Sequence, residues 1–122
     1  MSHYVDGFVL PLPKDKVEEY RAIAEKASKV WLEHGALEYR ECVGDDLNIE
    51  GMVPFPKIAA AGEADTVVFA YIVYNSKEHR DEVNAKVMAD PRLTEMGAPD
   101  NMPFDCSKMA YGGFKTVVYA KA

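Results

Sequence analysis

The feature that most constrains the fold is the apolar segment at residues 66–74, TVVFAYIVY. From Val67 to Tyr74 it contains no charge, glycine or proline, and most of its residues are β-branched or aromatic, which favours a strand over a helix. The segment is much too short for a membrane-spanning helix, which needs about 20 apolar residues. Successive side chains of a strand point to opposite faces, so this strand is apolar on both, and each face of its sheet requires a cover.

Length and composition indicate one globular domain that covers residues 1–122. The 20 acidic and 14 basic residues give a formal net charge of -6, which opposes binding to the phosphate backbone of nucleic acids. No apolar segment of signal-peptide type opens the chain, so we expect a cytoplasmic protein that does not enter the membrane. In that reducing compartment Cys42 and Cys106 are expected to be free thiols, and a disulfide between them is the less favoured alternative.

Residues 4–12 predict a first strand that ends at Pro11 and Pro13, because proline cannot donate to the ladder of backbone hydrogen bonds. The face expected to lie against the helices carries Val5, Gly7 and Val9. The missing side chain of Gly7 is expected to let a helix pack closely there. Asp6 would then point to the opposite face.

Residues 14–34 predict the clearest helix, since apolar residues recur at spacings of three and four, and Gly35 is expected to end it. Residues 36–43 carry several charges and predict a less buried edge strand. Residues 44–65 show no clear pattern; a connection of this length is either functional or contains an unrecognised element. Phe55, between two prolines, requires burial against this domain or a partner.

Ser76 is suited to cap a helix over residues 76–89. Its inner side is expected to carry Val83, Val87 and Met88. Pro91 breaks this helix and begins a short turn that ends near Gly97. A loop over residues 101–107 then leads to a last strand over residues 109–119, which contains a Gly112–Gly113 bend.

The predicted order is therefore strand, helix, strand, strand, helix, strand, which is the ferredoxin-like βαββαβ pattern of α+β proteins. In this fold a four-stranded antiparallel sheet has its first and third strands at the centre and both helices on one face. The other face would be left bare, carrying Phe8, Leu10, Phe69 and Tyr71 or their alternates. An apolar patch of that size marks an interface, and we expect a second copy of the chain to cover it, giving a homodimeric α+β barrel.

The chain contains several long motifs, namely Tyr4-Val5-Asp6-Gly7-Phe8, Lys77 with Arg80-Asp81, Asn84, Lys86, Met88, Asp90-Pro91-Arg92, Gly97, Met102-Pro103-Phe104-Asp105 and Tyr111-Gly112-Gly113-Phe114. In these motifs the chain resembles the YbaA-like family of small bacterial proteins of unknown function. The resemblance implies a dimeric α+β barrel, carries no catalytic residues, and departs from the family in the middle of the chain and at Cys106. Some family members carry a label that refers to signal-recognition-particle RNA, which the acidic balance of this chain opposes.

Asp6 is the most interesting single candidate. A carboxylate that points into a barrel between Tyr4 and Phe8 would be desolvated, and its pKa would be raised, which suits a general base or acid. The favoured alternative is a structural carboxylate that accepts hydrogen bonds from a tyrosine or an arginine. Tyr39, Glu41 and Tyr111 would line the same cavity if the strands have the required phase.

Arg80 and Arg92 are candidates for binding an anionic ligand. The favoured alternative is that their charges bond locally, with Asp90 capping the turn that begins at Pro91. The Gly112–Gly113 pair permits a bulge or a close approach of a ligand or another backbone, and a structural role is favoured. The three histidines and two cysteines lack metal-ligand spacing, so we expect neither a metal nor a cofactor.

The first functional hypothesis is a homodimer that binds a small, largely apolar organic ligand in each barrel. The predicted ligand-binding residues are Asp6, Phe8, Tyr39, Glu41, Phe69, Tyr71, Arg80, Arg92 and Tyr111. The second is a cofactor-free enzyme, of oxygenase or isomerase type, with Asp6 as the base. The third is a protein-assembly module that recruits a partner through residues 44–65, and RNA binding ranks last.

Overall fold

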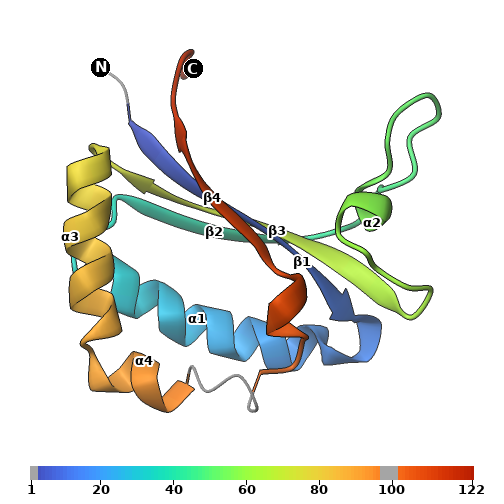
Figure 1. Ribbon diagram of the computed structural model, residues 1–122, viewed down its shortest axis with the longest axis horizontal. Helices are drawn as coiled ribbons and strands as arrows, with labels where there is room; N and C mark the ends of the chain where they lie inside the picture. Colours follow the sequence, from blue (N-terminus) through green and yellow to red (C-terminus); the bar gives the residue numbers. More distant parts are fainter. Residues whose placement is uncertain (1–2, 97–101) are drawn as a thin grey trace.

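The doubly apolar segment lies at the centre of the sheet. β3 (Asp65–Tyr74) pairs with β1 (Tyr4–Pro13), and β2 (Glu38–Val43) and β4 (Ala110–Lys115) form the two edges. The strand order β2-β3-β1-β4, with every neighbouring pair antiparallel, confirms the predicted ferredoxin-like sheet. The computed structural model describes residues 3–96 and 102–122 (Figure 1).

Among the described residues, the longer helices lie on one side of the sheet, as predicted (Figure 1). These are α1 (Val17–Glu33), α3 (Lys77–Met88) and α4 (Pro91–Met96). Short 3-10 helices, η1 (Lys14–Lys16) and η3 (Cys106–Lys108), precede α1 and β4. The connection between β2 and β3 contains the one-turn helix α2 (Phe55–Ile58), which the sequence did not predict.

The ends of the two main helices are fixed as predicted. Gly35 adopts a φ of +118°, in the region that favours glycine, and its N–H donates to the carbonyl oxygen of Leu32 at 3.2 Å, which ends α1. The side chain of Ser76 accepts a hydrogen bond from the N–H of His79 at 3.1 Å and so caps the start of α3.

The predicted phase of β1 is wrong. Asp6, Leu10 and Leu12 are buried on the helix side, whereas Val9 pairs with the half-exposed Phe69 on the opposite face. Val5 and Gly7 share the face of Val9, so Gly7 does not admit a helix; a Cβ at Gly7 would instead meet the ring of Phe114 at 3.2 Å. Local alternation could not decide the phase, because both sides of β1 are largely apolar.

Three smaller expectations also require correction. β1 continues to Pro13, which pairs with Asp65, because β4 pairs with β1 only as far as Val9 and a proline beyond that point has a neighbouring strand on one side alone. β4 ends at Lys115 rather than at residue 119. Met88 is 62% exposed and does not face inward, although Val83 and Val87 do. Gly97, the predicted end of the turn after Pro91, lies outside the described residues.

The set predicted for the open face is therefore divided between two faces. Phe69 is 46% exposed on the face away from α1, α3 and α4, and Tyr71 lies beside it, with ring centroids 6.3 Å apart. Phe8 and Leu10 lie on the helix side, where Leu10 is 1% exposed. The prediction that the sheet has one open apolar face holds, but β1 contributes different residues to it.

The core fills the space between sheet and helices in two adjoining clusters. One cluster joins Leu10, Leu12 and Val68 of the sheet to Tyr20 of α1. The other cluster contains Val30, Ala36, Ile72, Tyr74, Val83 and Val87. Phe8 packs against both clusters, so it lies where they meet.

Candidate functional site

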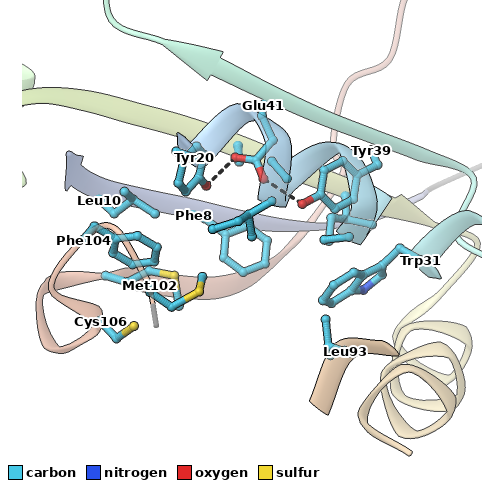
Figure 2. A pocket seen from close by; sticks show the side chains of 16 residues that line it. Phe8, Leu10, Tyr20, Trp31, Tyr39, Glu41, Leu93, Met102, Phe104 and Cys106 are labelled. Carbon is cyan, nitrogen blue, oxygen red and sulfur yellow. Dashed lines mark hydrogen bonds between the residues drawn. The ribbon is translucent and has the colours of Figure 1, made fainter. Parts of the chain in front are cut away.

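A cavity of about 270 Å³ lies on the helix side of the sheet (Figure 2). Side chains of β1, β2 and β3 form one wall, and α1 forms the opposite wall. Trp31 and Leu93 lie at one end, and Leu10, Met102, Phe104 and Cys106 lie at the other. The volume is close to the lower end, about 300 Å³, of typical small-molecule pockets, and the apolar, aromatic lining is also typical of them.

Small side chains leave this space open. Ala24 and Ala27 of α1 face Ala70 of β3 across the cavity. These helix alanines do not simply bring α1 close to the sheet, because they line a cavity between the two. Protein interiors are normally packed as tightly as organic crystals, so a cavity of this size is the leading candidate for a binding site.

The main polar group of the pocket is a carboxylate held by two tyrosines (Figure 2). The hydroxyl of Tyr20 donates to Oε1 of Glu41 at 2.7 Å, and the hydroxyl of Tyr39 donates to Oε2 at 2.7 Å. Tyr20 comes from α1, whereas Tyr39 and Glu41 both come from β2, two residues apart on the same face of the strand. The edge strand is therefore joined to the helix through this carboxylate.

The two tyrosines remain neutral donors. Burial raises the pKa of each phenol well above its ordinary value, and the neighbouring Glu41 carboxylate raises it further. Both hydroxyls therefore keep their protons at neutral pH and direct them to Glu41. Both oxygens of Glu41 act as acceptors in this arrangement, as the oxygens of a carboxylate do.

Trp31 is fixed at its end of the pocket by a hydrogen bond. Its indole Nε1–H donates to Oδ1 of Asn84 at 3.3 Å, and the hydroxyl of Tyr74 donates to the same oxygen at 3.2 Å. The tryptophan ring lies 5.9 Å from the ring of Tyr39. The aromatic wall is thus held by α3 as well as by α1 and the sheet.

Asp6 belongs to a separate cluster outside this pocket. Nη1 of Arg80 donates to Oδ1 of Asp6 at 2.9 Å, and the hydroxyl of Tyr111 donates to Oδ2 at 3.0 Å. The same Nη1 donates to the Tyr111 hydroxyl at 2.8 Å, and the guanidinium lies 5.1 Å from the centre of the Tyr4 ring. Asp6 is 1% exposed and does not line the pocket.

Burial raises the pKa of Asp6, and the hydrogen bond from Tyr111 and the charge of Arg80 offset only part of that effect. The predicted partners of a structural carboxylate, one tyrosine and one arginine, are both present. Asp6 is almost fully buried and its charge is paired with Arg80, which suits a structural carboxylate better than a base that takes a proton from a ligand.

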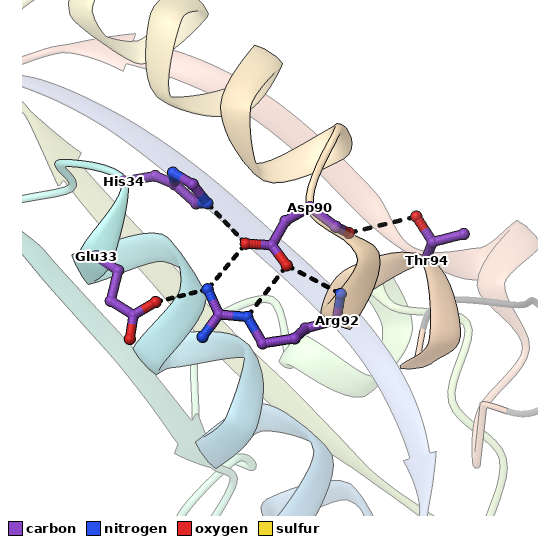
Figure 3. A network of polar contacts seen from close by, with 5 residues as sticks. All are labelled: Glu33, His34, Asp90, Arg92 and Thr94. Carbon is purple, nitrogen blue, oxygen red and sulfur yellow. Dashed lines mark hydrogen bonds and ion pairs between the residues drawn. The ribbon is translucent and has the colours of Figure 1, made fainter.

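Arg92 is part of a third polar cluster, at the junction of α1 and α4 (Figure 3). Its Nη2 donates to Oδ2 of Asp90 at 2.8 Å and also to Glu33, and its backbone N–H donates to Oδ1 of Asp90 at 2.9 Å. The ring of His34 lies 2.8 Å from Oδ2 of Asp90. The observed geometry is therefore that of the local alternative, in which Asp90 caps the turn that begins at Pro91.

The nine predicted ligand-binding residues therefore lie in four places. Phe8, Tyr39 and Glu41 line the pocket. Asp6, Arg80 and Tyr111 form the ion-pair cluster, and Arg92 joins the α1–α4 junction. Phe69 and Tyr71 lie on the open face.

Sequence reasoning missed much of the pocket wall, namely Tyr20, Trp31, Leu93, Met102 and Phe104. Tyr20 and Trp31 belong to the apolar pattern of residues 14–34, which predicts a buried helix face but carries no signal for a pocket. Within residues 3–96 and 102–122, no group of three or more histidine, cysteine or acidic side chains is placed to hold a metal ion. The same residues include no helix long and apolar enough to cross a membrane. Cys42 and Cys106 are both free thiols, as predicted.

Solved structures define the class of this fold. A putative antibiotic biosynthesis monooxygenase from Nitrosomonas europaea matches with a TM-score of 0.62 and 11% identity, over 94% of this chain and 90% of that chain. A NIPSNAP family protein of unknown function from Agrobacterium tumefaciens matches with a TM-score of 0.60 and 14% identity, over 97% and 91%. Identities this low show the fold alone, and the chain is an α+β protein of this ferredoxin-like class.

Sequence relatives define the family. Residues 3–106 match the family described as protein of unknown function, DUF1428. The uncharacterized protein YbaA of Escherichia coli K12 is 44% identical over 115 residues, which cover 94% of this chain and 97% of that protein. The protein of the same description from Shigella flexneri matches with the same values. The chain therefore belongs to this family, which confirms the YbaA-like resemblance seen in its motifs.

Proposed function

We propose that this protein acts as a homodimer in which each subunit binds a small, largely apolar organic molecule in the pocket between the sheet and α1. The observation that carries the proposal is the cavity of about 270 Å³ with its aromatic walls and the Glu41 carboxylate held by Tyr20 and Tyr39. Pockets that bind small molecules combine such apolar walls with a few fixed polar groups. The site lies on the helix side of the sheet, not on the open face where the sequence led us to expect it.

The homodimer rests on the apolar residues of the open face. Phe69 and Phe114 are 46% and 62% exposed there, and Val117, Val118 and Tyr119 follow at 62% to 91%. An exposed apolar surface that spans several elements marks an interface. A second copy offers the same surface, and a two-fold axis can bring the two together without leaving either uncovered.

Filling the cavity tests the ligand site. In the unmodified protein, neutral aromatic compounds such as indan and 3-phenylpropanol should raise the melting temperature in a concentration-dependent way. Ala27→Leu adds three carbons to the cavity wall and should remove this effect, while the exposed Ala85→Leu on α3 should retain it. Equal ligand stabilisation in the Ala27→Leu variant would show that these compounds bind elsewhere.

A charge on the open face tests the dimer. Phe69→Glu should convert the dimer to a monomer in sedimentation equilibrium, because a carboxylate would have to be desolvated in the interface. Met88→Glu places the same charge at an exposed methionine on α3 and should leave the dimer intact. A monomeric unmodified protein at micromolar concentration would refute the dimer without affecting the ligand proposal.

The geometry gives less support to an enzyme that uses Asp6 as a base. Asp6 lies outside the pocket, and both of its oxygens already accept hydrogen bonds from Arg80 and Tyr111. The structural resemblance to a putative monooxygenase is compatible with ligand binding and carries no residue of a reaction to this chain.

One observation favours protein assembly as a second candidate. The connection between β2 and β3 exposes several large apolar side chains, namely Ile49, Met52, Val53, Phe55 and Ile58. If they recruit another protein, a Met52→Ser/Val53→Ser variant should keep the dimer and lose that partner in affinity purification. A weakened dimer in the same variant would assign these residues to the subunit interface instead.

A further inference from the structure

The charge in the pocket is unbalanced. Among the described residues that line it, Glu41 is the only acidic side chain, and none is a lysine or an arginine. A second hollow between α1 and β2 also reaches Glu41, and Arg21 is among the residues that line it. Arg21 is paired with Glu18 and Glu25, at 3.0 and 3.5 Å, so it does not neutralise Glu41. The pocket therefore presents an anion without a counter-charge.

The hydrogen bonds of this carboxylate specify what it can still bind. Each oxygen of Glu41 accepts one tyrosine hydroxyl, at 2.7 Å in both cases. A carboxylate oxygen has two acceptor positions, so each retains acceptor capacity toward the pocket. The protons of Tyr20 and Tyr39 are already committed to Glu41 and are not available to a ligand that needs a donor. A group that approaches here must bring its own N–H or O–H.

The aromatic walls favour the same kind of group. Phe8, Tyr20, Trp31, Tyr39 and Phe104 all line the pocket. The face of an aromatic ring attracts a cation, and the attraction increases when the site excludes water. An anionic ligand would meet both the negative faces of these rings and the charge of Glu41.

We propose that the pocket selects organic cations: molecules with an apolar or aromatic body and one protonated nitrogen that donates to Glu41. This inference rests on the proposed ligand-binding function and adds the chemical class of the ligand. The body of such a ligand occupies the space beside Ala24, Ala27 and Ala70, and its ammonium group lies against the carboxylate between Tyr20 and Tyr39. Carboxylic acids of the same shape are excluded by like charge.

Three probes of nearly equal shape test the inference on the unmodified protein: 3-phenylpropylamine, 3-phenylpropanol and 3-phenylpropanoate. Binding is measured through the fluorescence of Trp31, the single tryptophan of the chain, excited at a wavelength that the probes do not absorb. We expect the amine to bind about tenfold or more tightly than the alcohol, as a charge-assisted hydrogen bond requires, and the carboxylate to bind weakest.

Glu41→Gln removes the charge and keeps the size of the side chain. We expect the amine to lose its advantage over the alcohol in this variant, while the alcohol binds as before. Glu38→Gln makes the same change three residues earlier on β2, at an exposed residue outside the pocket, and should alter neither affinity.

The outcomes separate the two proposals. If the alcohol binds and the amine binds no better, the ligand class is wrong and the proposed binding function stands. If the carboxylate binds best, the class is likewise wrong. If none of the three probes binds, the proposed binding function fails and this inference fails with it. Because the first comparison uses the unmodified protein, a Glu41→Gln variant that does not fold leaves the test intact.

Discussion

Glu41 and Asp6 are both carboxylates on the helix side of the sheet, yet their partners give them different chemistry. Glu41 accepts hydrogen bonds from two neutral tyrosines and keeps its charge exposed to a cavity. Asp6 is almost fully buried and is paired with Arg80, so its charge is balanced inside the protein. A paired, buried carboxylate contributes mainly to structure, whereas an unbalanced one beside a cavity is available to a ligand.

We predict that Asp6→Ala lowers the free energy of unfolding by about 2–3 kcal/mol, because it leaves the largely buried Arg80 and the Tyr111 hydroxyl without an acceptor. Asp81→Ala removes the exposed partner of the same guanidinium and should cost less than about 1 kcal/mol. Urea denaturation at one fixed protein concentration, followed by Trp31 fluorescence, measures both changes. Equal losses would contradict the assigned roles.

Asp90 provides a prediction about pH. Hydrogen bonds from Arg92 and His34 hold the pKa of Asp90 well below its ordinary value. A carboxylate whose pKa is lowered by folding stabilises the native state above its unfolded pKa, about 3.9, and loses that contribution as the pH falls further. The difference in free energy of unfolding between the unmodified protein and Asp90→Asn should therefore narrow as the pH falls from about 5 toward 3.

Urea denaturation across that pH range measures the difference. Asp46→Asn, a change at an exposed residue of the connection between β2 and β3, is the matched control and should have little effect at any of these pH values. If the difference in free energy of unfolding between the unmodified protein and Asp90→Asn widens on acidification, Asp90 does not stabilise the junction as an anion.

At the scale of the element, α1 has two structural roles: it covers the sheet, and it forms one wall of the pocket. Tyr20, Ala24, Ala27 and Trp31 lie along the stripe that faces the sheet and line the cavity. The position of this stripe depends on where α1 ends and β2 begins. Gly35 sets that point, since the N–H groups of Gly35 and Ala36 satisfy the last carbonyl groups of the helix.

We predict that Gly35→Ala destabilises the protein by about 1–2 kcal/mol, because an alanine is strained at a φ of +118°. Gly62→Ala is a suitable control, because its φ is not positive and an added Cβ would approach Asp65 no closer than 3.7 Å. Thermal and urea denaturation measure both variants. Equal stability of the two would mean that the helix ends without help from glycine.

At the scale of the whole molecule, one side of the sheet is covered by α1, α3 and α4 (Figure 1). The other side leaves the aromatic residues Phe69 and Phe114 exposed. The pocket is built from one chain, so ligand binding and dimer formation are separable properties. The proposed dimer adds the second cover that the apolar sequence of β3 requires.

We predict that the melting temperature of the unmodified protein rises with protein concentration, since association stabilises the folded state by mass action. Over a hundredfold range of protein concentration, the melting temperature of the Phe69→Glu variant should stay constant, because a monomer does not associate. It should also lie below that of the unmodified protein. Differential scanning calorimetry measures both series. A melting temperature that does not depend on concentration in the unmodified protein would count against the dimer.

The sequence by itself determined the order of the elements, the sheet order and the fact that the main helices share one side of the sheet. These follow from signals within single segments: the period of apolar residues, the glycine after α1, the serine before α3 and the uninterrupted apolar run of β3. The candidate residues Tyr39, Glu41 and Phe8 were also identified, because these strand side chains were expected to line a cavity.

Only the tertiary structure decided which way β1 faces and where the pocket lies. Both faces of β1 are largely apolar, so its phase depends on distant partners: Arg80 for Asp6, and the helix-side core for Leu10. The pocket depends on alanines of α1 and β3 that lie opposite each other, and on Tyr20 reaching Glu41 across 21 positions of the chain. A cavity is a property of the space between elements, and no single segment carries a signal for it.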